Sequence, residues 1–202
     1  AWSYSAIREE GTDDESEYNN KIFRVLIGIV MLIGIGLLTF MKPFLSVYVG
    51  KEYYSAWKYT PFLTVGCIYL TMASFMATSY TVHKDSFGYL FSGTFGAIFN
   101  IAMNFILIPQ VGVYGAAIAT CISYILVFVF RLFHTRKYIQ YNINNKEFIV
   151  GSTALVLSAG LMFIDNRFGF LLQCVILAAT IYLFSDIWLP IVRKILKLKG
   201  RR

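Results

Sequence analysis

Residues 22–41 read IFRVLIGIVMLIGIGLLTFM, and Arg24 is the only charged residue among them. A helix of this length is about 30 Å long at 1.5 Å per residue, which matches the hydrocarbon core of a bilayer. Further apolar blocks follow along the chain, and together they predict six membrane spans. The predicted spans are 22–41, 61–82, 87–108, 114–133, 148–164 and 169–190, with the fifth span short.

The composition supports a membrane protein. Of the 202 residues, 57% are hydrophobic and 14% are charged, and the mean hydropathy is +0.62. These values exclude a disordered chain, a secreted disulfide scaffold and an ordinary soluble enzyme. The predicted fold class is all-α, a polytopic transmembrane bundle with short connections between antiparallel helices. Cys67, Cys121 and Cys174 lie in different apolar blocks, so we expect small buried residues and neither zinc ligands nor disulfide partners.

The lysines and arginines predict which ends of the spans face the cytoplasm. If the N-terminal segment lies inside and the spans alternate, 14 of the 18 basic residues are inside and 4 are outside. The outside residues are Lys42, Lys51, Lys58 and Arg167. The positive-inside rule then places both visible ends in the cytoplasm, and an odd number of spans would spoil this separation.

The chain divides into three predicted regions, which are a cytoplasmic loop segment (1–21), the six-span bundle (22–190) and a basic cytoplasmic tail (191–202). The first region is polar, is acidic around residues 9–17 and begins at Ala1, so we expect a fragment that lacks an upstream part. The basic residues of the tail attract anionic lipid head groups by about 1 kcal/mol each, which makes membrane lipids expected partners. Nucleic acid is not an expected partner, because no aromatic residues are interleaved with these charges.

The spans show no chemistry typical of an enzyme. No span carries an acidic or basic residue near its middle, and Ser-His-Asp, HExxH and glycine-rich phosphate-binding motifs are absent. We therefore predict no catalytic residue, no metal and no cofactor. The longest outside connection, 42–60, is rich in tyrosine and predicts a short interfacial helix, with a sugar-stacking platform as the alternative.

Small and neutral polar residues recur at helical spacing in the second and third spans. The second span carries Thr64, Cys67, Thr71, Ser74, Thr78 and Thr81, and the third carries Gly88, Ser92, Gly96, Asn100 and Asn104. Such stripes indicate either close packing between helices or the wall of a hydrated path for a polar solute. The candidates for a transport path are Asn100, Asn104, Ser92, Thr71, Ser74 and Thr78.

Residues 100–124 read NIAMNFILIPQVGVYGAAIATCISY. This stretch resembles a signature of the C-terminal half of the polysaccharide biosynthesis transporters, the Wzx-type oligosaccharide-lipid flippases of the multidrug/oligosaccharidyl-lipid/polysaccharide exporter superfamily. The residues that carry the resemblance are Pro109, Gly112, Gly115, Ala116, Ala117, Ala119 and Thr120. Physically, they favour a tight turn followed by close helix packing. Two weaker elements, Tyr48–Ala56 and Trp2-x-Tyr4, are also similar to the family.

The resemblance implies a bacterial cytoplasmic-membrane protein in which two helical bundles rock around a central cavity, with the present chain forming the last six spans. Its implied function is to flip an undecaprenyl-pyrophosphate-linked oligosaccharide to the outer leaflet for surface polysaccharide biosynthesis, with polysaccharide assembly proteins as further partners. A pyrophosphate needs cations, which the other bundle supplies, or which Lys84 and Arg131 supply at the cytoplasmic rim. The alternatives are a drug or peptidoglycan-precursor exporter of the same superfamily, a membrane enzyme of polysaccharide assembly, and a non-transporting scaffold.

Overall fold

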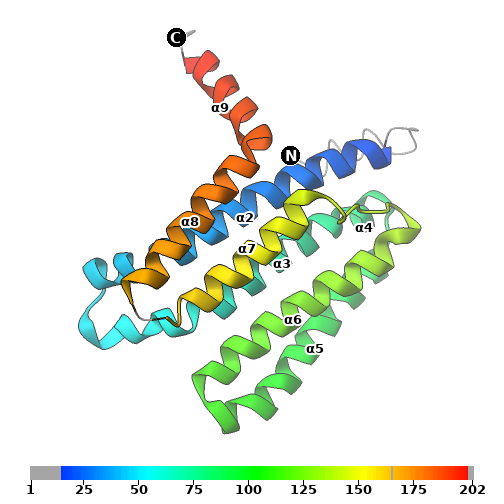
Figure 1. Ribbon diagram of the computed structural model, residues 1–202. Helices are drawn as coiled ribbons and strands as arrows, with labels where there is room; N and C mark the ends of the chain where they lie inside the picture. The colour runs from blue at the N-terminus through cyan, green and yellow to red at the C-terminus, as the bar shows by residue number, and fades with distance from the viewer. Residues whose placement is uncertain (1–14, 165, 200–202) are drawn as a thin grey trace.

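The computed structural model describes residues 15–164 and 166–199, and the regular secondary structure of these residues is entirely helical (Figure 1). The elements are α2 (Glu15–Tyr48), η1 (Lys51–Lys58), α3 (Thr60–Met76), α4 (Thr78–Val82), α5 (Ser86–Val111), α6 (Val113–His134), η2 (Thr135–Lys137), α7 (Lys146–Leu161), α8 (Arg167–Leu183) and α9 (Ser185–Lys199). The predicted all-α fold class is confirmed for this part of the chain.

The helices form a row in which helices consecutive in the chain run antiparallel, whereas the packed pairs α3–α6 and α2–α7 run parallel. α6 lies between α5 and α3, and α2 packs against α3, α7 and α8. Figure 1 shows the α5–α6 hairpin on one side of the molecule and α8 on the other. Short connections force consecutive helices to run in opposite directions. α5 packs chiefly against α6, so most of its surface stays exposed, with Phe105 at 79%.

One face of α2 forms the centre of the core. Phe23, Ile27, Met31, Ile35 and Leu38 recur every three or four residues, and each is at most 1% exposed. This spacing places their side chains on one side of the helix. They belong to a single buried cluster with apolar residues of α3, α6 and α7. Burial of this face therefore holds α2 in the middle of the row.

Four helical segments are long and apolar enough to cross a membrane, namely Ser16–Tyr48, Thr60–Val82, Ser86–Val111 and Val113–Lys137. They contain the first four predicted spans. The other two predicted spans coincide largely with α7 and α8, which have 16 and 17 residues. Helices of that length are at or below the lower limit for crossing a hydrocarbon core without bilayer adjustment. Among the described residues, the structure thus shows four candidate spans, one shorter apolar helix (α8) and the 16-residue helix α7.

The last predicted span, 169–190, is divided by the structure. α8 ends at Leu183, and the backbone leaves helical geometry at Phe184 (φ −100°, ψ 17°) before α9 begins. The Phe184 side chain is fully buried, and the Lys146 ammonium donates to the Leu183 carbonyl at 3.2 Å. These contacts satisfy the end of α8, because a terminal carbonyl has no partner inside its own helix. Ser185 and Asp186 follow the break, but Ile187, Trp188 and Leu189 come directly after them, which is why hydropathy alone missed it.

Three further boundaries differ from expectation. α2 begins at Glu15, inside the predicted loop 1–21, and it runs past residue 41 to Tyr48. Residues 1–14, with Trp2, Tyr4 and much of the acidic run, lie outside the described residues. The connection 42–60 contains the end of α2 and the short helix η1, in agreement with a predicted short helix. Residues 191–199 of the predicted tail are part of α9, and residues 200–202 lie outside the described residues.

The two ends of the row differ in chemistry. One end, here named the basic end, holds the start of α2, the 83–85 turn, the 135–145 connection and the end of α8. Ion pairs join these parts, such as Arg24–Glu147 and Lys137–Asp85. The other end, here named the aromatic end, holds η1, the turn at Gly112, residues 162–164 and the start of α8, and ring pairs join its parts, such as Tyr59–Tyr114. That the basic end faces the cytoplasm stays a prediction.

Candidate functional site

The neutral polar residues of α3 and α4 form a face that points out of the bundle. This surface, here named the α3 polar face, consists of Thr64, Cys67, Thr71, Ser74, Thr78 and Thr81. Four of these residues are exposed, and Thr64 and Thr78 are half-buried. The expected burial of Cys67 is therefore wrong. Its neighbour Gly66 takes the buried position instead, where a Cβ would lie 2.9 Å from the Cα of Cys121 on α6.

A groove between α2 and α3 runs along the α3 polar face. It has a volume of about 310 Å³, and Gly34, Thr64, Cys67 and Thr71 are among its lining residues. From Thr64 to Thr81 the face extends about 25 Å at 1.5 Å per residue, which is close to the thickness of the hydrocarbon core. The Thr71 hydroxyl donates to the Cys67 carbonyl at 2.8 Å, and the lone pairs that its oxygen exposes at that depth favour water, another protein surface or a polar solute over lipid.

The α3 polar face ends at a pocket on the basic end. This rim pocket has a volume of about 380 Å³, which lies within the range of small-molecule sites. Its lining residues are Tyr80, Thr81, Lys84, Asp85, Ser86 and Tyr89. Thr81 belongs both to the α3 polar face and to the lining of the rim pocket. The α3 polar face therefore connects the groove between α2 and α3 with the rim pocket.

Lys84 lies where the sequence predicted, in the turn between α4 and α5. Its backbone has a φ of +53°, which residues other than glycine, asparagine and aspartate seldom adopt. Its side chain is exposed, and among the described residues no hydrogen bond or ion pair involves its ammonium group. The rim pocket therefore contains one cation that is available to a ligand.

Asp85 lies beside Lys84 but is committed to other partners. Its Oδ1 accepts the Gly88 N–H at 2.8 Å and so caps the start of α5. Its Oδ2 accepts from the Tyr138 hydroxyl at 2.8 Å and from the Lys137 ammonium at 3.0 Å. Donation by Gly88, Lys137 and Tyr138 favours the carboxylate and lowers the pKa of Asp85 from 3.8 to about 2.

Arg131 does not lie open at the rim as predicted. It is 7% exposed, and its Nε donates to Ser92 Oγ at 3.1 Å while its Nη1 donates to the Ala73 carbonyl at 3.0 Å. These partners come from α5 and α3, which close over the guanidinium because α6 is packed between them. Arg131 is next to the rim pocket all the same, with its guanidinium carbon 5.8 Å from the ring centroid of Tyr89.

The polar stripe of α5 lies against α6. Gly88, Ser92 and Gly96 are buried, and a Cβ at Gly96 would collide with the Val127 side chain. Ser92 is fully buried and therefore lines no open surface. At this position the structure favours the packing interpretation of the stripe.

The two asparagines of the stripe are half-buried and bonded to each other. Asn104 Nδ2 donates to the backbone carbonyl and to Oδ1 of Asn100, both at 2.9 Å. Asn100 Nδ2 lies 3.5 Å from Thr120 Oγ1 on α6. Asn104 also borders a shallow apolar groove of about 370 Å³ with Ile101 and Phe105. Both amides thus belong to the α5–α6 seam, and Asn104 lies at its edge.

The residues of the family motif build the α5–α6 hairpin. Gly112 joins the two helices with φ +60° and ψ −134°, a conformation that requires glycine. A Cβ at Gly115 would lie 2.5 Å from the Leu107 carbonyl group, so the start of α6 touches the backbone of α5. Pro109 lies within the last turn of α5, which continues to Val111. Ala117 and Ala119 are buried, and Ala116 and Thr120 are half-buried. The motif is a packing element.

Sequence reasoning missed a charge cluster at the basic end. Arg24 Nη2 donates to Glu147 Oε1 at 2.7 Å and to Asp186 Oδ2 at 2.8 Å, and Lys146 Nζ lies 3.2 Å from Asp186 Oδ1. Glu147 is fully buried, and its Oε2 has no hydrogen-bond partner among the described residues. The sequence did contain a signal, because opposite charges occur at the predicted cytoplasmic ends of three spans. Pairing them required the tertiary structure.

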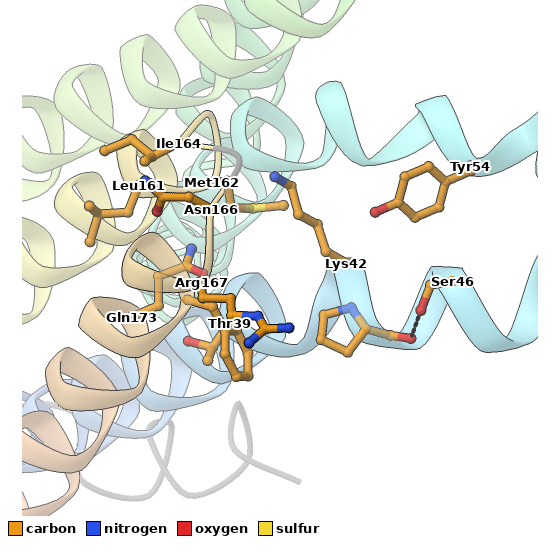
Figure 2. A pocket seen from close by; sticks show the side chains of 12 residues that line it. Thr39, Lys42, Ser46, Tyr54, Leu161, Met162, Ile164, Asn166, Arg167 and Gln173 are labelled. Atoms are coloured by element: carbon orange, nitrogen blue, oxygen red, sulfur yellow. Dashed lines mark hydrogen bonds between the residues drawn. The ribbon is translucent and has the colours of Figure 1, made fainter.

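A second cavity lies at the aromatic end, between the end of α2, the 162–166 connection and the start of α8 (Figure 2). Its volume is about 450 Å³. Lys42 and Arg167, two of the four basic residues predicted outside, line it together with Tyr54 and the buried Gln173. The Lys42 ammonium also forms a cation–π contact with Trp57 and lies 3.9 Å from the centroid of its ring. Each end of the row thus has a polar cavity with at least one cation.

Comparison with known proteins identifies the general class. Over 200 aligned residues, the chain is 27% identical to the uncharacterized membrane protein MJ1068 of Methanocaldococcus jannaschii. The alignment covers 93% of this chain and 38% of that protein, so the chain spans less than two fifths of the relative's length. No family model and no solved structure matches. The relative and the apolar helices together show a membrane protein with several transmembrane helices.

Proposed function

We propose that this chain is the C-terminal part of a membrane transporter that flips a lipid-linked oligosaccharide to the outer leaflet for surface polysaccharide biosynthesis. The substrate class that fits the family resemblance is an undecaprenyl-pyrophosphate-linked repeat unit. The protein would lie in the cytoplasmic membrane with six spans, the basic end inside, and polysaccharide assembly proteins as further partners. The remaining part of the transporter would supply the second bundle.

The exposed α3 polar face is the observation that carries this proposal. A helix that only packs within a bundle turns its polar residues toward its neighbours, as α5 turns Ser92 toward α6. α3 instead buries apolar residues such as Met72 and leaves Thr71 and Ser74 exposed. A polar face of about 25 Å that crosses the hydrocarbon core suits the wall of a cavity between two bundles, where sugar hydroxyls exchange hydrogen bonds with it.

The two polar cavities add a second line of support. The α3 polar face leads into the rim pocket at the basic end, and the cavity beside Lys42 and Arg167 lies at the aromatic end. A substrate with an anionic head group needs cations wherever it stops at a membrane surface, because a desolvated anion must be paired. The placement of basic residues at both ends therefore suits such a substrate better than a neutral one.

The test is flipping of a fluorescent lipid-linked oligosaccharide by the full-length protein in proteoliposomes. We expect the double variant Thr71→Leu/Ser74→Leu to fold with normal yield and to lose most of its flipping. Thr153→Leu is the matched control. Thr71 and Thr153 are both exposed, and each donates to the carbonyl four residues earlier at 2.8 Å, but Thr153 lies on α7. Flipping at the wild-type rate by the double variant, or no flipping by the wild-type protein, would contradict the proposal. Transport of a drug or a peptidoglycan precursor instead would assign another branch of the superfamily.

A further inference from the structure

Arg131 is a buried charge that lacks an opposite charge. It is 7% exposed, its two hydrogen-bond partners are the neutral Ser92 hydroxyl and the Ala73 carbonyl, and no carboxylate among the described residues forms an ion pair with it. A guanidinium has five N–H donors, so further donors remain. A charge buried in a membrane helix without compensation is costly, and such residues usually mark a functional site.

Lys84 places a second cation within reach of the same region. It lines the rim pocket, whereas Arg131 lies next to the pocket, 5.8 Å from the ring centroid of Tyr89. Lys84 also has a left-handed backbone, with a φ of +53°. This conformation ends α4, since the Lys84 N–H donates to the Thr81 carbonyl at 3.3 Å and the Asp85 N–H donates to the Tyr80 carbonyl at 2.8 Å, and it fixes Lys84 in the turn beside the pocket.

The acidic residue nearby does not neutralise these two cations. Asp85 accepts from the Gly88 N–H, the Tyr138 hydroxyl and the Lys137 ammonium, and Lys137 is its ion-pair partner. The charges around the pocket therefore sum to an excess of positive charge that belongs to Lys84 and Arg131. The hydroxyl groups of Thr81 and Ser86 provide neutral donors on the pocket wall.

We infer that the rim pocket binds a phosphate or diphosphate anion, which Lys84 contacts directly and which supplies the missing counter-charge for Arg131. Oxygen atoms of such an anion accept charge-assisted hydrogen bonds, which are the strongest that an ammonium group makes. On the basis of the proposed function, this anion is the diphosphate that links the lipid to the sugar of the substrate. Tyr80 and Tyr89, whose rings contact each other edge to face with centroids 6.5 Å apart, then form the aromatic wall of the pocket beside the anion.

The test measures binding to the purified full-length protein in detergent by calorimetry, with inorganic pyrophosphate, farnesyl diphosphate and uncharged farnesol as probes. We expect pyrophosphate or farnesyl diphosphate to bind and farnesol not to bind. Equal affinity for both diphosphates indicates recognition of the free anion, and binding of farnesyl diphosphate alone indicates a lipid head group. Failure of both diphosphates to bind would overturn the inference.

Two variants and one control assign the binding to the pocket. Lys84→Asn removes the charge and keeps a side chain that tolerates the left-handed conformation, and we expect it to weaken binding about tenfold or more. Arg131→Gln should weaken binding as well. If Arg131→Gln does not fold, the binding measured with Lys84→Asn alone tests the inference. Arg136→Gln, which removes an exposed cation at the same end, should bind like the wild type. Unchanged binding by Lys84→Asn would show the inference to be wrong.

These outcomes separate the pocket from the proposed function. If binding depends on Lys84 but the full-length protein flips no lipid-linked sugar, the anion site holds and the transport proposal fails. If the protein flips the substrate but Lys84→Asn binds and transports like the wild type, the transport proposal holds and the anion site fails.

Discussion

Arg24 of α2 and Glu147 of α7 lie 123 positions apart in the chain, yet they form a hydrogen-bonded ion pair of 2.7 Å between Nη2 and Oε1. The Glu147 side chain is fully buried, whereas 43% of the Arg24 side chain is exposed. Arg24 also pairs with Asp186 of α9. One guanidinium therefore joins three helices at the basic end.

We expect Arg24→Met to lower the free energy of unfolding by about 2–3 kcal/mol, because it leaves the buried Glu147 carboxylate without its cation. This value lies between those for exposed and for fully buried pairs, since Arg24 is half exposed. The change in the free energy of unfolding is measured in detergent by denaturation with guanidinium chloride or by heating. Lys146→Met is the control, because it breaks an exposed pair with Asp186 and an exposed hydrogen bond to the Leu183 carbonyl, and it should cost less than about 1 kcal/mol. Equal effects of the two variants would contradict this assignment.

Asp85 predicts a dependence of stability on pH. Its pKa in the folded protein is about 2, below the usual 3.8, so the folded state favours the carboxylate. The stabilisation is fully present above the unfolded value and is lost as the pH falls from about 4 to about 2. Asp85→Asn keeps an N-cap but not the charge. The Tm difference between the wild type and this variant should be constant above pH 5 and should shrink toward pH 2. A difference that does not change with pH would argue against the Lys137 and Tyr138 contacts.

Substitution by alanine should have opposite effects on stability at Gly112 and at Gly160. Apart from the local backbone and the chain neighbours, neither position has an atom within 4 Å of an added Cβ, so contact with the rest of the protein plays no part. Gly112→Ala forces a side chain into φ +60° and ψ −134° and should cost about 1–3 kcal/mol. Gly160→Ala lies in a helix and should be neutral or should stabilise by up to about 1 kcal/mol. Thermal unfolding of both variants provides the measurement, and equal destabilisation would show that the Gly112 turn differs from this description.

Asn100 and Asn104 should respond differently to leucine. Asn100→Leu removes an acceptor of Asn104 and crowds Thr120 in the α5–α6 seam, so we expect a lower folded yield. Asn104→Leu places its side chain at the apolar groove with Ile101 and Phe105, where it fits, so yield should stay near normal. The contact between Asn100 and Thr120 joins two helices, and interhelical hydrogen bonds in membrane proteins average only about 0.6 kcal/mol. Losing this bond should therefore lower the stability only slightly. If Asn100→Leu folds normally but glycan export falls, Asn100 lies on the transport path instead.

The sequence by itself determined that the chain is largely helical and that consecutive helices alternate in direction. Apolar blocks of roughly twenty residues predict helices for a reason that is local, since the backbone must bond internally in lipid. The separation of basic residues to the two ends follows from alternation along the chain, and the structure places Lys42 and Arg167 together at one end. The turn at Gly112 was also predictable, because its conformation requires glycine.

Only the tertiary structure decided which polar stripe is exposed. In sequence, the stripes of α3 and α5 have the same helical spacing and invite the same two interpretations. Gly66 lets α6 approach α3 on the face opposite the hydroxyl groups, whereas Gly96 lets α6 approach α5 on the stripe itself. Arg131 was predicted at the rim for its place near the end of α6, but Ser92 and Ala73 enclose it. A helix fixes which residues share a face through its own periodicity, but whether that face is buried depends on the neighbour that packs against it.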